Sequence, residues 1–256
     1  MQVHFERSGA GAPLIILHGL FGSLDNWRTL SKTWSQSFTV FAIDQRNHGR
    51  SPHSNVFTYQ AMAEDLKQFL HQQNLLSAHL LGHSMGGKTA MQFAVTYPDM
   101  VNKLVVVDIA PKAYLPGYDD IFAALYTLDV TALRSRQEAD AKLAQTIPAL
   151  AVRQFLLKNL QRDTSGTFRW RINLDGISNN YDEILKGIET HRQFAKPTLF
   201  IRGGNSHYIR DEDVSAIGTL FPQAQTITLP HVGHWVHAEA PQAFGKIVLD
   251  FLSVFE

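Results

Sequence analysis

Short runs of apolar residues recur along this chain, and each ends in glycine, proline or a polar residue. The runs cover residues 13–17, 39–43, 78–81, 104–107, 198–201 and 225–229. Segments with apolar residues at helical spacing lie between several of them, around residues 24–34, 62–70 and 85–97. Continuous apolar runs are typical of parallel strands buried on both faces, and their alternation with helices is typical of a doubly wound sheet. The sequence therefore predicts an α/β fold with a mostly parallel sheet flanked by helices.

Residues 111–191 break this pattern. They contain helical stretches and one short extended piece, at residues 121–128, 133–144, 151–160 and 167–172, and no clear core strand. We interpret residues 111–191 as a helical cap inserted into a core made of residues 1–110 and 192–256. The alternative is that these are ordinary connecting helices.

The charge and residue composition excludes several classes of protein. The 23 Lys and Arg residues balance the 23 Asp and Glu residues, so the chain lacks the basic excess of a nucleic-acid-binding protein. There is no cysteine, which excludes disulfides, thiolate nucleophiles and cysteine-ligated metals. No stretch reaches the roughly 18 apolar residues of a membrane-spanning helix, and the first residues lack the apolar segment of a signal peptide. We expect a cytoplasmic protein that is not inserted in a membrane.

A candidate nucleophile lies in the segment Gly82-His83-Ser84-Met85-Gly86, which matches the pattern G-x-S-x-G. The segment follows an apolar run and opens a helical one, which is the strand–turn–helix context of a nucleophile elbow. The glycines matter there because larger side chains would clash with the neighbouring strand and helix. We predict that Ser84 is the nucleophile. The alternative is an ordinary strand–helix turn that contains a serine.

Three other segments, together with the Ser84 motif, resemble a known family. They are residues 18–23 (HGLFGS), 46–51 (RNHGRS) and 233–239 (GHWVHAE). The chain resembles the α/β-hydrolase superfamily over nearly its whole length, and within it the small bacterial esterases of the YbfF type, which are related to the mitochondrial abhydrolase-domain esterases. The resemblance implies the α/β-hydrolase fold and an ester or thioester hydrolase.

His234 is the candidate general base. It follows the last apolar run within a short loop, which gives the order serine, acid, histidine expected of this fold. From a loop its ring can reach Ser84 and remove the hydroxyl proton as the serine attacks. His231 and His237 are close rivals in sequence, but the glycine before His234 and the family pattern favour His234.

The triad acid departs from the usual pattern. Most α/β-hydrolases carry it in a G-x-x-D segment after the strand that follows the cap, but this chain reads Gly-Gly-Asn-Ser there, so Ser206 stands in place of the aspartate. Serine cannot balance the charge of an imidazolium. Asp108, which ends the preceding core strand, is the best substitute. Asp211 and Asp213 are the alternatives, and Ser206 is a possible auxiliary that hydrogen-bonds near His234.

The resemblance also implies an oxyanion hole and an apolar pocket. In this superfamily the oxyanion is bound by backbone amides of the loop after the first long strand and of the residue after the nucleophile, which by position are Leu20 and Met85. Aromatic residues are plentiful in the cap, and ligand pockets are mostly apolar. Trp235, beside the base, and the cap residues Phe122 and Tyr126 are the candidate substrate-binding residues.

The expected activity is hydrolysis of short-to-medium acyl esters or thioesters through an acyl-enzyme, with no cofactor and no metal. The substrate is a small molecule, no nucleic acid or membrane is involved, and the protein is a monomer or a homodimer. A lactonase, a carbon–carbon bond hydrolase and a perhydrolase of the same fold are rival readings. A non-catalytic ligand-binding member of the fold is a rival from another class. Dehalogenases and epoxide hydrolases of this fold use aspartate as nucleophile, so Ser84 argues against both.

Overall fold

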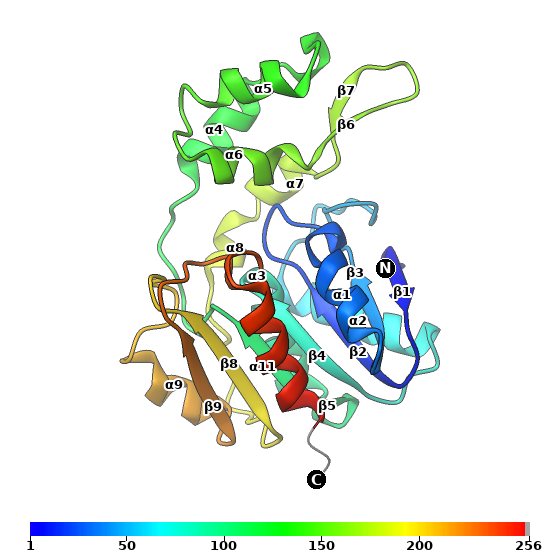
Figure 1. Ribbon diagram of the computed structural model, residues 1–256, viewed down its shortest axis with the longest axis vertical. Helices are drawn as coiled ribbons and strands as arrows, with labels where there is room; N and C mark the ends of the chain where they lie inside the picture. The colour runs from blue at the N-terminus through cyan, green and yellow to red at the C-terminus, as the bar shows by residue number, and fades with distance from the viewer. Residues whose placement is uncertain (254–256) are drawn as a thin grey trace.

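The computed structural model describes residues 1–253 and contains a seven-stranded sheet in the order β1-β3-β2-β4-β5-β8-β9. β1 pairs antiparallel with β3, and the remaining neighbours pair in parallel. Figure 1 shows the sheet as the centre of the larger, lower part of the molecule. The strands are β1 (Phe5–Ser8), β2 (Ala12–Leu17), β3 (Phe38–Ile43), β4 (Ala78–His83), β5 (Val101–Val107), β8 (Thr198–Gly203) and β9 (Ala224–Leu229).

Helices cover both faces of this sheet because successive strand residues point to opposite sides. Leu14 and Ile16 of β2 pack in one buried cluster with Trp34 of α1 and Phe244 of α11. Residues 15 and 17 of the same strand belong to the other cluster, with residues of α2, α3 and α9. The core helices are η1 (Leu24–Trp27), α1 (Arg28–Trp34), α2 (Tyr59–Gln72), α3 (Met85–Thr96), η2 (Pro98–Met100), α9 (Asp213–Leu220), α10 (Val236–Glu239) and α11 (Pro241–Ser253).

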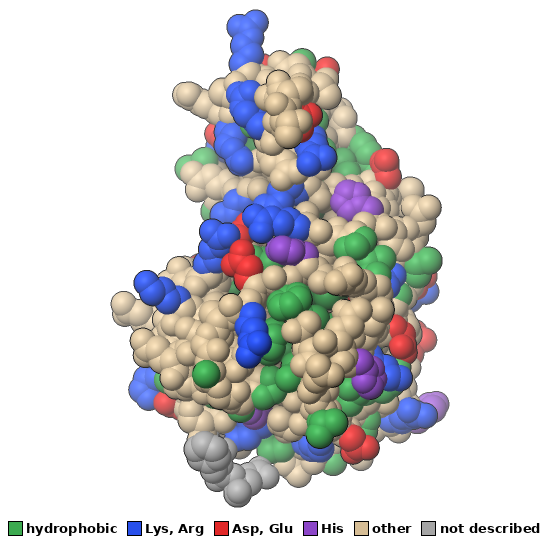
Figure 2. All heavy atoms as spheres, turned by 90° about the vertical axis from the view of Figure 1, so that its right-hand side faces the viewer, with side chains coloured by type: hydrophobic (Ala, Val, Ile, Leu, Met, Phe, Trp, Pro, Cys, Tyr) green, Lys and Arg blue, Asp and Glu red, His purple; other side chains and the backbone are tan. Residues whose placement is uncertain are grey.

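The segment between β5 and β8 contributes no strand to the central sheet. It lies beyond one end of the sheet, at the top of Figure 1, and forms the narrower upper part of the molecule in Figure 2. Its elements are α4 (Asp119–Thr127), η3 (Val130–Ala132), α5 (Arg136–Leu143), α6 (Leu150–Leu157), β6 (Leu160–Arg162), β7 (Phe168–Trp170), α7 (Leu174–Ser178) and α8 (Tyr181–Leu185). We continue to propose that residues 111–191 are an inserted cap.

The expected α/β architecture is confirmed, and three details differ from the sequence-based expectation. β1 was not predicted, because its four residues carry no apolar run. The last strand is not buried on both faces: β9 lies at the sheet edge and most of its side chains are exposed. The helix expected over residues 151–160 ends at Leu157, and Leu160 instead begins a short hairpin by pairing with Trp170.

Candidate active site

Ser84 occupies the tight turn between β4 and α3. Its φ of 53° and ψ of −121° are strained for a residue with a side chain, and strain of this kind is concentrated at functional sites. The flanking glycines make the turn possible. A Cβ on Gly82 would lie 2.1 Å from the carbonyl oxygen of Gly86, and a Cβ on Gly86 would lie 2.4 Å from that of Leu17. The turn therefore presents the Ser84 hydroxyl at the end of the sheet.

His234 and Asp108 form a close pair at the same end of the sheet. The Nδ1 atom of His234 lies 2.7 Å from Oδ2 of Asp108. Asp108 follows β5, next to the strand that leads to Ser84, and its side chain is fully buried. A carboxylate bonded to Nδ1 fixes that nitrogen as the proton donor and leaves Nε2 free to accept a proton.

Two further donors hold the Asp108 carboxylate. The amide of Gly203 donates to Oδ1 at 3.0 Å, and the Ser206 hydroxyl donates to Oδ2, the oxygen that also faces His234. Ser206, which stands where most α/β-hydrolases have the aspartate, thus contacts the carboxylate of Asp108 at the end of β5. A buried carboxylate needs such donors, because desolvating an unpaired charge is costly. Ser206 therefore contacts the carboxylate and contributes no charge of its own.

His83 and Tyr208 position His234 from two other sides. Nε2 of His83 lies 2.9 Å from the carbonyl oxygen of His234, and because a carbonyl only accepts, Nε2 carries the proton. Burial holds the pKa of His83 well below 6.5, so the ring stays neutral. The Tyr208 ring stacks on the His234 imidazole with centroids 3.9 Å apart. Neither contact was predicted from the sequence.

The rival residues make other contacts. Asp211 pairs with Arg202 and its side chain is 90% exposed, whereas Asp213 pairs with Lys112 at 2.7 Å. Among the histidines, His237 is buried in a stack against a tryptophan. Within residues 1–253, His234 is the histidine that bonds to a carboxylate in this cluster.

The loop after β2 carries the predicted oxyanion donor Leu20. In the described part of the chain, no protein acceptor pairs with the Leu20 or Met85 backbone amide. The next residue, Phe21, donates its amide to Nε2 of His48 at 3.1 Å, which fixes the loop. Burial lowers the pKa of His48 to about 3, so the ring remains a neutral acceptor. Two free amides beside Ser84 are what an oxyanion requires.

A comparison with known proteins places the chain in a family. The family model of the alpha/beta hydrolase fold matches residues 12–241. The chain belongs to the α/β-hydrolase family. The expected likeness to YbfF-type and abhydrolase-domain esterases is confirmed among its relatives. This α/β-hydrolase is 42% identical to the sn-1-specific diacylglycerol lipase ABHD11 of Mus musculus, over 94% of this chain and 80% of that protein.

Two further likenesses cover nearly the whole of both partners. Esterase YbfF of Escherichia coli is 38% identical, over 94% of this chain and 93% of its own length. A solved structure described as a marine microorganism esterase superposes with a TM-score of 0.95 at 44% identity, over 98% of this chain and 99% of that one.

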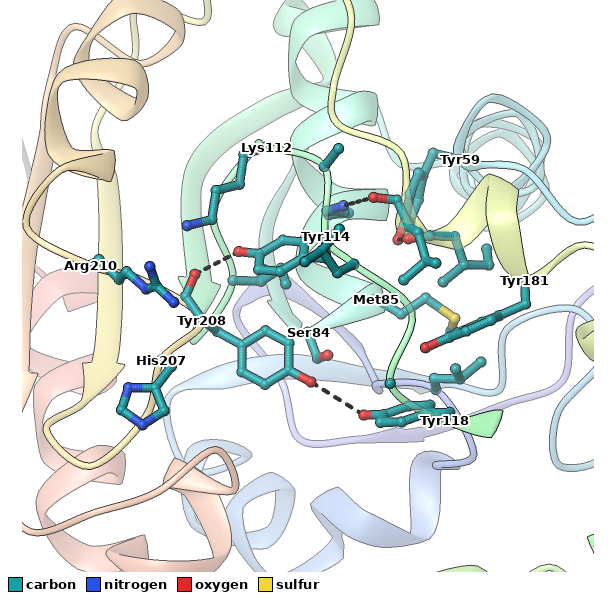
Figure 3. Close-up of a pocket in the computed structure, with 18 residues that line it drawn as sticks. Tyr59, Ser84, Met85, Lys112, Tyr114, Tyr118, Tyr181, His207, Tyr208 and Arg210 are labelled. Carbon is teal, nitrogen blue, oxygen red and sulfur yellow. Dashed lines mark hydrogen bonds between the residues drawn. The ribbon is translucent and has the colours of Figure 1, made fainter. Parts of the chain in front are cut away.

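Two cavities of this α/β-hydrolase meet at Ser84. One has a volume of about 450 Å³ and the other about 210 Å³. Both are lined by Ser84, Leu20, Tyr118 and Tyr208. Figure 3 shows Tyr118 and Tyr208 with their hydroxyls facing each other, 3.4 Å apart, near Ser84. Ser84 therefore has open space on two sides.

The candidate substrate-binding residues fall into two groups. Trp235 lines the smaller cavity, beside His234. Phe122 and Tyr126 line neither cavity, so we correct both assignments. Phe122 is a buried cap residue that packs edge-on against Phe21. Tyr126 lies near the end of α4, is 48% exposed and donates to a surface aspartate.

The larger cavity contains residues that the sequence analysis missed, above all Lys88. This lysine lies in α3, one turn beyond Ser84, and is 1% exposed. Tyr59, Tyr114 and Tyr181 also line the cavity. Lys88 follows Ser84 by four residues in the sequence, but nothing in the sequence indicates that the lysine is buried.

Within residues 1–253, no helix has the length and apolar character required to cross a membrane. The same residues contain no cluster of three or more His, Asp or Glu side chains arranged to hold a metal ion. On the face drawn in Figure 2, acidic and basic side chains both occur, in keeping with the equal numbers of the two kinds in the chain.

Proposed function

We propose that this protein is a serine esterase that cleaves esters or thioesters of short to medium-length acids through an acyl-enzyme on Ser84. Membership of the class is plain: the chain is a carboxylic-ester hydrolase of the α/β-hydrolase family. The observation that carries the catalytic assignment is the 2.7 Å contact between Asp108 and His234, at the cavity that Ser84 also lines.

In the first half of the proposed reaction, His234 Nε2 takes the proton of the Ser84 hydroxyl as its oxygen attacks the substrate carbonyl carbon. The carbonyl oxygen becomes an oxyanion and accepts hydrogen bonds from the Leu20 and Met85 amides. The tetrahedral species collapses, the bond to the leaving oxygen or sulfur breaks, and His234 gives its proton to the leaving group. The acyl group then remains on Ser84.

In the second half, water replaces the alcohol or thiol. His234 takes a proton from the water as its oxygen attacks the acyl carbon, and the same two amides hold the oxyanion again. Collapse releases the acid and returns the proton to the Ser84 oxygen. The Asp108 carboxylate stabilises the imidazolium that forms twice per cycle.

The experiment is turnover of p-nitrophenyl esters of increasing acyl length by the wild type and by Ser84→Ala. We expect clear turnover in the wild type and a loss of roughly 10⁶-fold in the variant, by analogy with the serine knockout in subtilisin. Turnover that survives in Ser84→Ala would remove the assignment. No wild-type turnover at any length, with circular dichroism showing both proteins folded, would favour a carbon–carbon substrate or a ligand-binding role.

Two finer points belong to the same proposal. Acyl thioesters are expected substrates because an acyl-enzyme mechanism accepts oxygen or sulfur leaving groups. A cytoplasmic location fits the absence of cysteine, since a chain without thiols has no need of an oxidising compartment.

A further inference from the structure

Only one of the two cavities at Ser84 is lined by His234, the proposed base. His234 lines the smaller cavity and does not line the larger one. In the proposed reaction His234 must hand its proton to the leaving group, so the leaving group lies on the His234 side. The acyl group of the substrate then extends into the larger cavity. This step rests on the proposed function.

The larger cavity contains a buried cation, Lys88. The side chain is 1% exposed and projects from α3 one helical turn after Ser84. Ser84 and Lys88 both line this cavity. An acyl chain attached to Ser84 that extends into the larger cavity therefore shares it with Lys88.

The surroundings of Lys88 are polar but carry no negative charge. Nζ donates to the carbonyl oxygens of Leu185 and Lys186, where α8 ends, and lies 4.7 Å from the centre of the Tyr114 ring and 5.5 Å from that of Tyr59. Among residues 1–253, no acidic side chain lines the larger cavity and none pairs with Lys88.

An unpaired buried ammonium is costly, and lysines are rarely buried without a partner. Desolvation lowers the pKa of Lys88 to about 7. Glu183 of α8 forms an exposed ion pair with the side chain of Lys186. Lys112, at the same cavity, is paired with Asp213. Within residues 1–253, the buried ammonium of Lys88 thus has no acidic side chain as a counter-charge in this cavity.

We propose that the acyl group of the substrate carries its own carboxylate, and that Lys88 pairs with it. The substrate class is the half-ester or half-thioester of a short dicarboxylic acid, with Lys88 as the residue that determines specificity. A carboxylate matches the site better than a phosphate does, because one buried ammonium balances one charge rather than nearly two.

The test compares monoethyl glutarate with ethyl valerate, which has the same acyl length without the carboxylate. Ethanol release is followed by proton NMR for the wild type, for Lys88→Met and for the control Lys32→Met, an exposed lysine on α1. We expect the wild type to prefer the half-ester in kcat/KM, and Lys88→Met to lower that preference roughly 10- to 100-fold, mainly through KM. Lys32→Met should keep the wild-type preference.

The preference should also depend on pH. Tyr59 and Tyr114 face Lys88, and burial raises the pKa of both above the usual value of tyrosine. Lys112, Arg210 and His207 also line the cavity. With the pKa of Lys88 lowered to about 7, the half-ester preference should fall as the pH rises through that value, and Lys88→Met should lose this pH dependence. Because the result is a ratio of two esters, the protonation of His234 affects both terms alike.

Two outcomes overturn the proposal. They are a wild type that prefers the neutral ester and an equal loss on both esters in Lys88→Met. An equal loss would mean that Lys88 only anchors α8 to α3. Failure of the proposed function can be distinguished from failure of the Lys88 proposal. It would appear as turnover of ethyl valerate that survives in Ser84→Ala.

Discussion

The cavity at Ser84 has a core side and a cap side, and the two are built differently. On the core side the proposed catalytic residues follow β4 and β5 or lie in the loop after β9. Hydrogen bonds hold them in place, and the Asp108 carboxylate by itself accepts three, from His234, Gly203 and Ser206. The cap side consists mainly of packed rings and aliphatic side chains. Strand topology thus positions the proposed chemistry, whereas the packing of the cap shapes what can bind.

Among changes on the core side and the cap side, we expect the largest loss of activity from a substitution at Asp108. Asp108→Asn keeps the size of the side chain but removes the charge that stabilises the imidazolium and can leave the ring in the wrong tautomer. We expect turnover of p-nitrophenyl butyrate to fall on the order of 10⁴-fold, by analogy with the serine-protease case. The matched control is Asp211→Asn, at an exposed aspartate, which should stay near wild type. Near-normal activity in Asp108→Asn would contradict the core-side assignment.

A change within the cap should affect stability far more than chemistry. Phe122 is buried against Phe21, so Phe122→Ala should lower the free energy of unfolding by about 3–5 kcal/mol. Tyr126→Ala, at an exposed position near the end of the same helix, should cost less than about 1 kcal/mol. Urea titration followed by tryptophan fluorescence measures both. Equal losses in the two variants would show that the cap is not held by this packing.

The smallest expected effect concerns Ser206. Ser206→Ala removes one of three donors to the Asp108 carboxylate but leaves the His234 contact in place. Hydrogen bonds to charged groups contribute about 1.5–3 kcal/mol, so kcat/KM for p-nitrophenyl butyrate should fall roughly tenfold or somewhat more. Ser215→Ala, at an exposed serine of α9, is the control. Unchanged activity in Ser206→Ala would show that the hydrogen bond from Ser206 to Asp108 does not contribute to catalysis.

The core side could be predicted from the sequence because its residues follow strands. Ser84 lies in a motif with glycines that the turn requires, and Asp108 ends an apolar run next to that turn. Their meeting with His234 follows from the parallel order of the strands. The sequence also indicated that Ser206 would lie near this pair, because it occupies the position of the usual acid.

The cap side could not be predicted in the same way. Phe122 and Tyr126 lie four residues apart on α4 and share a helical face by spacing, yet one is buried and the other is half exposed because the helix ends one residue after Tyr126. Tyr208 stacks on His234 only because of the path of the loop between β8 and α9. Such placements depend on tertiary packing, which periodicity does not encode.

Covalent labelling with a fluorophosphonate identifies the nucleophile. The wild type, Ser84→Ala and Asp108→Asn are treated with a fluorophosphonate, and the adduct is located by mass spectrometry of tryptic peptides. We expect one adduct, on Ser84, that is absent from Ser84→Ala and forms much more slowly in Asp108→Asn. An adduct on another residue, or labelling that persists in Ser84→Ala, would contradict the assignment of Ser84 as the nucleophile.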